Sequence, residues 1–207
     1  MNQNLDSRIE NRTKAVVLCS GGMDSVTVLN LVAKEYKPEN ISVLFVSYGQ
    51  KTVNRERESS KIAASRIGAN WIDFELKDLG KITKTALIHD KSYTTEVQGR
   101  NTILIGLGSA LAQTLEGKSL YIGLQAADVV YGDAQPEYFD YIKKAIKSAY
   151  SIDLYAPLLY KTKKEIFQIA KEINLDLKMT YSCYFNEIEP CGECPSCKVR
   201  MAAEEDF

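Results

Sequence analysis

The sequence has little histidine and no excess of charge of either sign. Among its 207 residues there is one histidine, and 26 lysine and arginine residues are balanced by 27 aspartate and glutamate residues, for a formal net charge of −1. This balance argues against broad binding to a nucleic-acid backbone, so we expect small-molecule substrates and no nucleic-acid partner. The single histidine, His89, lies in an irregular polar stretch, where a surface or structural role is more common than a catalytic one.

Long hydrophobic runs are also missing. No segment approaches the ~20 apolar residues that cross a bilayer, and residues 1–14 lack the apolar core of a signal peptide. We therefore expect a cytoplasmic protein with no membrane partner. In a reducing compartment, the five cysteines of the chain are expected to be metal ligands or buried apolar residues rather than disulfides.

The chain is long enough for one well-filled core and too short for two full domains. Five apolar runs have the length and continuity of buried strands: 15–19, 41–46, 71–74, 119–123 and 152–155. Helical periodicity or helix-start signals follow each run: 26–36, 52–67, 102–115, a helix that starts at Pro136, and one that starts with a Thr162–Glu165 capping box. This alternation predicts an α/β fold with a doubly wound five-stranded parallel sheet.

The predicted organisation of the chain has three parts. Residues 1–12 are expected to form a flexible leader, residues 13–178 an α/β domain, and residues 179–207 a small metal-binding segment. Within the α/β domain, residues 77–98 have weak periodicity and are expected to form an irregular excursion or lid.

The motif Ser20-Gly21-Gly22-Met23-Asp24-Ser25 follows the first predicted strand and precedes a helix. Adjacent glycines let a backbone approach an anion, serine hydroxyls donate hydrogen bonds, and a helix N-terminus favours negative charge. The motif therefore predicts a phosphate-binding loop, although the lysine of a Walker A loop is missing. The alternative is a plain strand-to-helix turn capped by Asp24 or Ser25.

Other polar residues follow the later strands. Ligands of open α/β sheets bind outside the carboxyl ends of the strands. The phosphate-loop motif, Tyr48–Lys51, Arg100 and Asp128 are therefore expected to converge on one crevice.

Four cysteines near the C-terminus have the pattern C-x7-C-x2-C-x2-C: Cys183, Cys191, Cys194 and Cys197. Four thiolates suit a tetrahedral structural zinc, whose closed coordination shell leaves no position for a substrate. An iron–sulfur cluster is the main alternative, and unliganded thiols or a disulfide pair are another.

Together these motifs resemble one family. The phosphate-loop motif, Tyr48-Gly49-Gln50, Gly99-Arg100-Asn101, Thr180–Tyr184 and the Cys191–Cys197 cluster are similar to those of the QueC family, the 7-cyano-7-deazaguanine synthases. This family belongs to the N-type ATP pyrophosphatases, or PP-loop proteins, with an adenine nucleotide alpha hydrolase-like fold. The resemblance covers residues 14 to 206. It implies an ATP-dependent ligase of queuosine biosynthesis that adenylates 7-carboxy-7-deazaguanine, aminates it with ammonia to an amide, and dehydrates the amide to the nitrile.

The resemblance also implies roles for individual residues. Residues Ser20, Gly21, Gly22, Met23, Asp24 and Ser25 would hold ATP, as would Tyr48 and Gln50. Arg100 and Asn101 would face the deazaguanine, and the four cysteines would bind zinc. Asp24 is expected to hold Mg²⁺ or, alternatively, to cap the helix. Asp128 could accept hydrogen bonds from a guanine-like edge or be an exposed acid.

The chain departs from the usual family pattern around the acceptor half of the site. Gln98 stands where proline is usual, Lys51-Thr52 where Arg-His is common, and 129–136 lacks the usual arginine. These departures keep two alternatives open: a ligase that couples the activated acid to another amine, such as a peptide or protein, and a catalytically silent ATP-binding module. A homodimer is compatible with the sequence, which does not indicate an oligomeric state.

Overall fold

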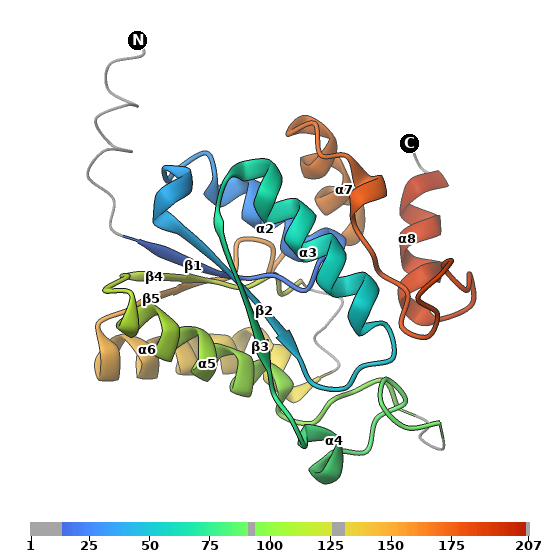
Figure 1. The fold of residues 1–207 in the computed structure, drawn as a ribbon, viewed down its shortest axis with the longest axis horizontal. Coiled ribbons are helices and arrows are strands. Elements are labelled where there is room, and N and C mark those ends of the chain that lie inside the picture. Colours follow the sequence, from blue (N-terminus) through green and yellow to red (C-terminus); the bar gives the residue numbers. More distant parts are fainter. Residues whose placement is uncertain (1–13, 91–93, 126–130, 206–207) are drawn as a thin grey trace.

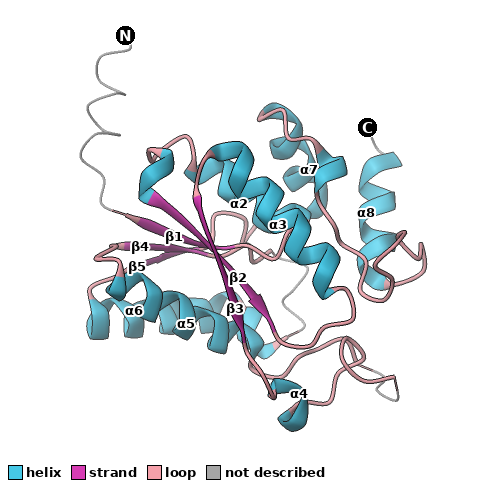
Figure 2. Ribbon diagram, in the orientation of Figure 1, coloured by secondary structure: helices cyan, strands magenta, loops and turns pink. Residues whose placement is uncertain are grey.

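The computed structural model describes residues 14–90, 94–125 and 131–205. Five parallel strands form one sheet in the order β3-β2-β1-β4-β5. Their bounds are Ala15–Leu18 (β1), Ile41–Ser47 (β2), Asn70–Glu75 (β3), Ser119–Tyr121 (β4) and Asp153–Tyr155 (β5). The strands fan across one another with the twist normal for such sheets, and Figure 2 shows β1 near the middle of the fan. The predicted doubly wound α/β sheet is confirmed.

Helices cover both faces of the sheet (Figure 1). One face packs against α2 (Met23–Val32), α3 (Val53–Ile67) and α7 (Lys163–Glu172), and the other against α5 (Arg100–Thr114) and α6 (Pro136–Tyr150). Shorter elements complete the described residues: η1 (Pro38–Asn40), α4 (Leu79–Ile82), η3 (Gly132–Ala134), η4 (Leu177–Met179) and α8 (Pro195–Glu205).

The unbroken apolar run of β1 reflects burial on both faces. Ala15 and Val17 contribute to the core under α2, α3 and α7, whereas Val16 and Leu18 contribute to the core under α5 and α6. Alternate side chains of a strand point to opposite faces, so a strand covered on both sides can be apolar at every position. β1 therefore anchors the loop that follows it from two independent cores.

Several boundaries differ from those predicted. Helix α2 begins at Met23 rather than Val26 because Gly22 is already its N-cap, and the segment after Val32 forms turns. The 77–98 excursion contains the short helix α4. Helix α8 was not predicted. It begins at Pro195, and proline suits the first turn of a helix, where its missing N–H costs nothing.

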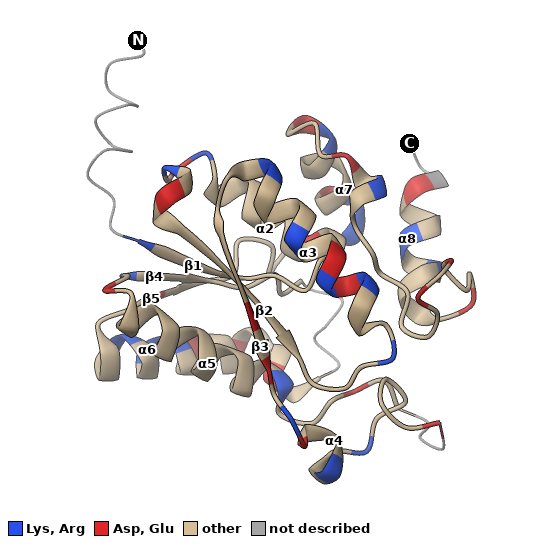
Figure 3. Ribbon diagram, viewed as in Figure 1, with Lys and Arg blue, Asp and Glu red and all other residues tan. Residues whose placement is uncertain are grey.

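The last predicted helix starts as expected. Thr162 accepts a hydrogen bond from the N–H of Glu165, and the Glu165 side chain accepts one from the N–H of Thr162, which confirms the capping box. Within the described ranges, no helix is long and apolar enough to span a membrane. Charged residues of both signs are interspersed over the helices and loops (Figure 3).

Candidate active site

The candidate site lies at the carboxyl ends of the strands, around the switch point between β1 and β4. A cavity of about 410 Å³ opens there, within the usual range for small-molecule sites. It is walled by the phosphate loop, by the segments after β2 and β4, by the start of α5, and by the C-terminal segment. Of the predicted site residues, those lining it are Ser20, Gly22, Met23, Asp24, Ser25, Tyr48, Gln50, Arg100 and Asn101. The predicted convergence therefore occurs, while Asp128 lies outside the described residues and Lys51 does not line the cavity.

The phosphate loop is shaped by Gly21. Its φ of +83° is in the left-handed region, and a Cβ at this position would come within 2.5 Å of the backbone oxygen of Glu56. The loop hydroxyls are held locally, since Ser25 Oγ donates to Gly22 O at 2.9 Å and lies 3.3 Å from Ser20 Oγ. Helix α2 has no side-chain cap at Gly22. Its first N–H groups and dipole end therefore face the cavity ready for an anion.

Asp24 is paired with a lysine from a distant element. Lys163 Nζ, at the start of α7, donates to the two carboxylate oxygens of Asp24 at 2.7 and 2.8 Å. Both side chains are 19% exposed and both residues line the cavity. Asp24 lies in the first turn of α2 but is not its cap. Sequence reasoning missed Lys163, although the capping box next to it marked the start of its helix.

A hydrogen-bonded network follows β2. Glu56 accepts from Thr52 Oγ1 at 2.6 Å and from Gln50 Nε2 at 3.0 Å, and Gln50 Oε1 accepts from the N–H of Tyr48 at 2.8 Å. Burial raises the pKa of Glu56, and the bonds from Thr52 and Gln50 oppose this shift. The network fixes the orientation of the Gln50 amide. Glu56 therefore positions a residue that is predicted to bind ATP, although the sequence did not single out Glu56.

Arg100, at the start of α5, supplies a cation to the cavity. Its Nη1 lies 3.2 Å from the hydroxyl of Tyr48. Burial opposes the charge, but Tyr48 and nearby acidic groups raise the pKa of Arg100 above its ordinary value, so it stays charged. Burial raises the pKa of Tyr48, which stays a neutral phenol at pH 7. A guanidinium with donors beyond this one contact suits a carboxylate or phosphate.

Asn101 is tied to Asp133. Its backbone N–H donates to Asp133 Oδ2 at 2.8 Å, and its Nδ2 donates to Oδ1 at 3.1 Å. The start of α5 is thereby fixed to η3. Asn101 therefore lines the cavity while part of its hydrogen-bonding capacity is already used.

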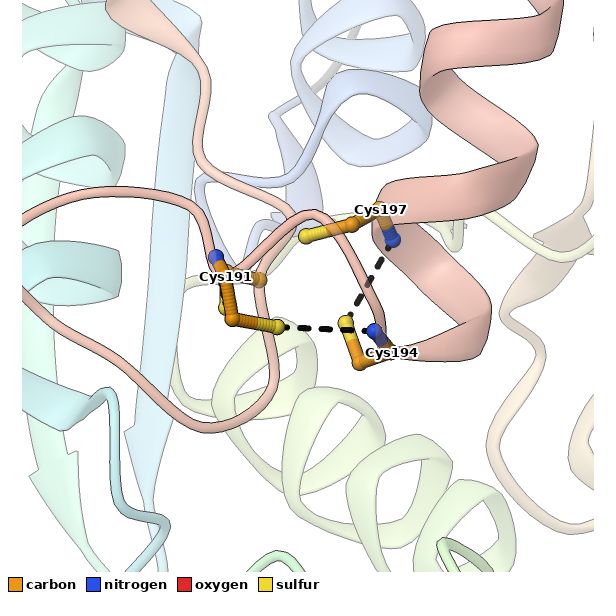
Figure 4. A group of neighbouring side chains, drawn as sticks. Cys191, Cys194 and Cys197 are labelled. Atoms are coloured by element: carbon orange, nitrogen blue, oxygen red, sulfur yellow. Dashed lines mark hydrogen bonds between the residues drawn. The ribbon is translucent and has the colours of Figure 1, made fainter.

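The four cysteines form one cluster. All four sulfur atoms lie within 4.8 Å of one another. Backbone N–H groups point at them: Cys194 N lies 3.4 Å from Cys191 Sγ, and Cys197 N lies 3.4 Å from Cys194 Sγ (Figure 4). Burial and the neighbouring Cys194 raise the pKa of Cys197 to about 12. Without a cation among them, the sulfurs cannot all be thiolates, so the donor set fits a metal ion.

The cysteine segment is joined directly to the phosphate loop. The N–H of Tyr181, two residues before Cys183, donates to Gly21 O at 2.9 Å. Arg200 of α8 holds the same segment through Thr180 O at 3.2 Å and Leu177 O at 2.9 Å. The C-terminal segment is therefore part of the wall of the site.

His89 has a local structural role. Its Nε2 lies 2.8 Å from Gly80 O and 3.2 Å from Thr83 O, so the ring ties together the excursion around α4. It is not among the residues that line the cavity.

Comparison with known proteins identifies the family. The family model described as "Queuosine biosynthesis protein QueC" matches residues 14–207. The chain belongs to the QueC family. Among curated relatives, the 7-cyano-7-deazaguanine synthase of Koribacter versatilis is 34% identical, and the match covers 93% of this chain and 89% of the relative. The 7-cyano-7-deazaguanine synthase of Thermoplasma volcanium is 32% identical, and the match covers 91% of this chain and 85% of the relative. The family membership predicted from the motifs is confirmed, and it implies the use of ATP.

Solved structures show the same fold at low identity to this QueC-family chain. The U34-tRNA thiolase NcsA from Methanococcus maripaludis, solved with its [4Fe-4S] cluster, matches with a TM-score of 0.59 and 14% identity over 96% of this chain and 66% of its own. The NH3-dependent NAD synthetase from Campylobacter jejuni matches with a TM-score of 0.56 and 19% identity, over 85% of this chain and 71% of the synthetase. These likenesses support the PP-loop type of α/β fold.

Proposed function

We propose that this protein is a 7-cyano-7-deazaguanine synthase. It would convert 7-carboxy-7-deazaguanine to the nitrile with ATP and ammonia. The observation that carries the proposal is the match, over more than nine-tenths of the chain, to synthases that are 32 to 34% identical. These relatives favour nitrile synthesis over coupling to a peptide or protein amine and over a silent ATP-binding module.

The chemistry requires two activations. Ammonia cannot displace oxide from a carboxylate, so the acid first takes AMP from ATP with release of pyrophosphate. Ammonia then displaces AMP and gives the amide. A second ATP activates the amide oxygen, and loss of AMP and a proton leaves the nitrile. Each of the two carboxylate oxygens thus leaves as part of an AMP molecule.

The residues of the cavity suit these steps. The loop Ser20–Ser25 would bind the ATP phosphates through its backbone and hydroxyls, and Lys163 would neutralise part of the pyrophosphate charge. Asp24 would hold Mg²⁺, a cation that favours carboxylate and phosphate oxygens. With Asp24 bound to Mg²⁺, Lys163 would be free to turn to the nucleotide. Tyr48 and Gln50 would flank the nucleotide.

Arg100 would receive the carboxylate of the deazaguanine, since its forked donors match two carboxylate oxygens. Asn101 would line the same half of the site. The acid would then lie between Arg100 and the phosphate loop, where its carboxylate would meet the α-phosphate of ATP.

We propose zinc for the four-cysteine site. A tetrahedral zinc with bonds of about 2.3 Å holds its sulfurs about 3.8 Å apart, close to the clustering in this chain. A cubane iron–sulfur cluster needs a wider set, because each thiolate binds a different iron. Zinc would hold the C-terminal segment against the phosphate loop and take no part in the chemistry.

The proposal is tested by product analysis. Purified protein with 7-carboxy-7-deazaguanine, ATP, Mg²⁺ and ammonium is expected to give the nitrile, detected by mass spectrometry, with AMP and pyrophosphate. Asp24→Ala should abolish AMP formation, while Asp140→Ala on the exposed side of α6 should leave it unchanged. Amide as the final product, or no turnover by the wild-type protein, would refute nitrile synthesis. Normal AMP formation by Asp24→Ala would show that the phosphate site is elsewhere.

A further inference from the structure

Glu56 places a carboxylate in the wall of the cavity. The residue is half-buried and lines the cavity together with Thr52 and Gln50, which donate to its two carboxylate oxygens at 2.6 and 3.0 Å. Each oxygen accepts one of these bonds and keeps a further lone pair for another donor. Asp24 is the other carboxylate among the described residues that line the cavity, and it is paired with Lys163. Glu56 is therefore the lining carboxylate whose oxygens are held by neutral donors.

Glu56 and Arg100 act on each other. The positive charge of Arg100 opposes the rise in the pKa of Glu56, and Glu56 helps to raise the pKa of Arg100. Tyr48 joins them in a chain of contacts, because its N–H donates to Gln50 Oε1 at 2.8 Å and its hydroxyl lies 3.2 Å from Arg100 Nη1. A deazaguanine acid held by Arg100 would therefore react in the part of the cavity that contains Glu56.

The surroundings of Glu56 favour the acceptance of a proton. Burial raises the pKa of Glu56, and the bonds from Thr52 and Gln50 lower it. The charge of Arg100 also lowers this pKa, whereas Glu187 of the C-terminal segment raises it. The net direction is upward, so the carboxylate holds a proton more firmly than an exposed glutamate does. A carboxylate of raised pKa beside the reacting groups suits general base catalysis.

The amination step needs such a base. At neutral pH ammonia is present mainly as ammonium, which has no lone pair and cannot attack a carbonyl carbon. We propose that the carboxylate of Glu56 binds ammonium and takes a proton from it, so that ammonia is formed beside the acyl adenylate. This inference rests on the proposed function and names the base of that reaction.

Atoms and charges balance in this step. One proton moves from ammonium to Glu56, and the freed lone pair of the nitrogen forms the C–N bond. The C–O bond to AMP breaks, and its electron pair stays on the phosphate oxygen. The second surplus proton moves from the new amide nitrogen to that phosphate oxygen, and Glu56 gives its own proton to water when the products leave.

The test separates the two half-reactions in the full-length protein. Exchange of labelled pyrophosphate into ATP needs the acid but no ammonium, whereas amide formation needs all three substrates. In Glu56→Gln the exchange should be largely kept, because glutamine can still bond Gln50 and Thr52. Amide formation, measured by mass spectrometry as kcat/KM for total ammonium, should fall about 100-fold near pH 7. The loss should shrink below about tenfold near pH 9, because free ammonia from solution then no longer needs the base.

A second variant changes the pKa of the base without removing the base. Thr52→Val deletes a hydrogen bond that lowers the pKa of Glu56, so the acid limb of the pH profile for amide formation should shift to higher pH. This measurement still decides the matter if Glu56→Gln does not fold. Glu58→Gln, on the exposed side of α3, is the matched control and should behave as the wild type does.

Three results would overturn the inference and leave the proposed function standing. A loss of amide formation that does not change with pH, or an equal loss of pyrophosphate exchange, would show that Glu56 only holds Gln50 in place. An acid limb that Thr52→Val leaves unmoved would assign the proton transfer to another group. If the wild-type protein shows no pyrophosphate exchange with the deazaguanine acid, the proposed function fails as well.

Discussion

The phosphate loop and the four-cysteine segment wall the same cavity, yet they are held in different ways. The phosphate loop continues from β1, which is buried in the two cores that cover the sheet. The apolar cluster of the cysteine segment is small: Tyr181, Cys183, Cys194 and Cys197, with Tyr184 and Cys191 beside them. One wall is therefore held by two large cores, and the other by a small cluster, by the hydrogen bonds of Arg200 and by the packing of Ala203.

The difference teaches where the site is vulnerable. The hydrogen bond from Tyr181 N to Gly21 O joins the two walls at the point where phosphate would bind. Disorder in the cysteine segment would reach the loop through this contact, whereas the two cores would keep the sheet intact. We therefore expect damage to the metal site to reduce ligand binding more than it reduces folding of the sheet.

The largest effect on ligand binding is expected from Cys194→Ser. Losing one of the four ligands should weaken metal binding. Because metal binding would stabilise the folded form of the segment, the segment should become less ordered. The affinity for an ATP analogue should fall at least about tenfold, or ~1.4 kcal/mol, and protease should cleave first within 179–207. Metal analysis measures the bound metal, calorimetry measures the affinity for the ATP analogue, and mass spectrometry of the proteolytic fragments locates the cleavage. Cys19→Ala, outside the cluster, should keep its metal. Full nucleotide affinity in metal-free protein would show that packing alone holds this wall.

The largest effect on the free energy of unfolding is expected from Gly21→Ala. The new Cβ would need a left-handed backbone and would meet Glu56 O within 2.5 Å. The strain and overpacking together should cost about 2 to 4 kcal/mol of unfolding free energy, measured by urea denaturation. Gly106→Ala is the matched control, because no atom lies within 4 Å of a Cβ there. Equal stability of the two variants would mean that α3 does not confine the loop.

A smaller effect, dependent on pH, is expected from Glu56→Gln. Burial raises the pKa of Glu56 above its ordinary value of 4.5. The unfolded chain thus loses this proton first, and the wild-type protein loses stability as the pH rises from about 4.5 through the folded pKa. Glutamine is neutral and can still bond Gln50 and Thr52, so the stability of the variant relative to wild type should increase over that range. Urea midpoints at several pH values measure it. Glu58→Gln is the exposed control, and a difference that does not vary with pH would contradict the prediction.

The smallest effect is expected from Thr162→Ala. It removes the cap of α7, the helix that carries Lys163 to Asp24, and should cost about 1 kcal/mol of unfolding free energy. Thermal melting measures it, with Thr114→Ala near the end of α5 as a control. A loss of activity larger than the loss of stability would show that the cap also positions Lys163.

Local patterns in the sequence predicted the elements and two of the motifs. The apolar run of β1 and the glycines after it are enough to predict a strand-to-helix loop at the cavity, and the spacing of the last three cysteines is enough to predict that their sulfurs lie together.

Lys163 was missed because its partner, Asp24, lies 139 residues away in the sequence. Glu56 was missed, although Thr52 and Gln50 are near it in the sequence, because the sequence does not show which carboxylate of a charged helix is buried. Tyr181 lies in a motif that was singled out, but its bond to Gly21 joins residues far apart in the chain. The start of α2 at Met23 was missed because a glycine can serve both as loop and as helix cap.

The wall of the cavity is completed late in the synthesis of the chain. Its wall includes Leu18 near one end of the chain and Val199 near the other. A ribosome that has made the whole sheet has still not made the residues that complete the site. Until Val199 emerges, the nascent chain lacks part of the wall of this cavity. Ligand binding at the site is therefore expected only after the C-terminal segment has been made.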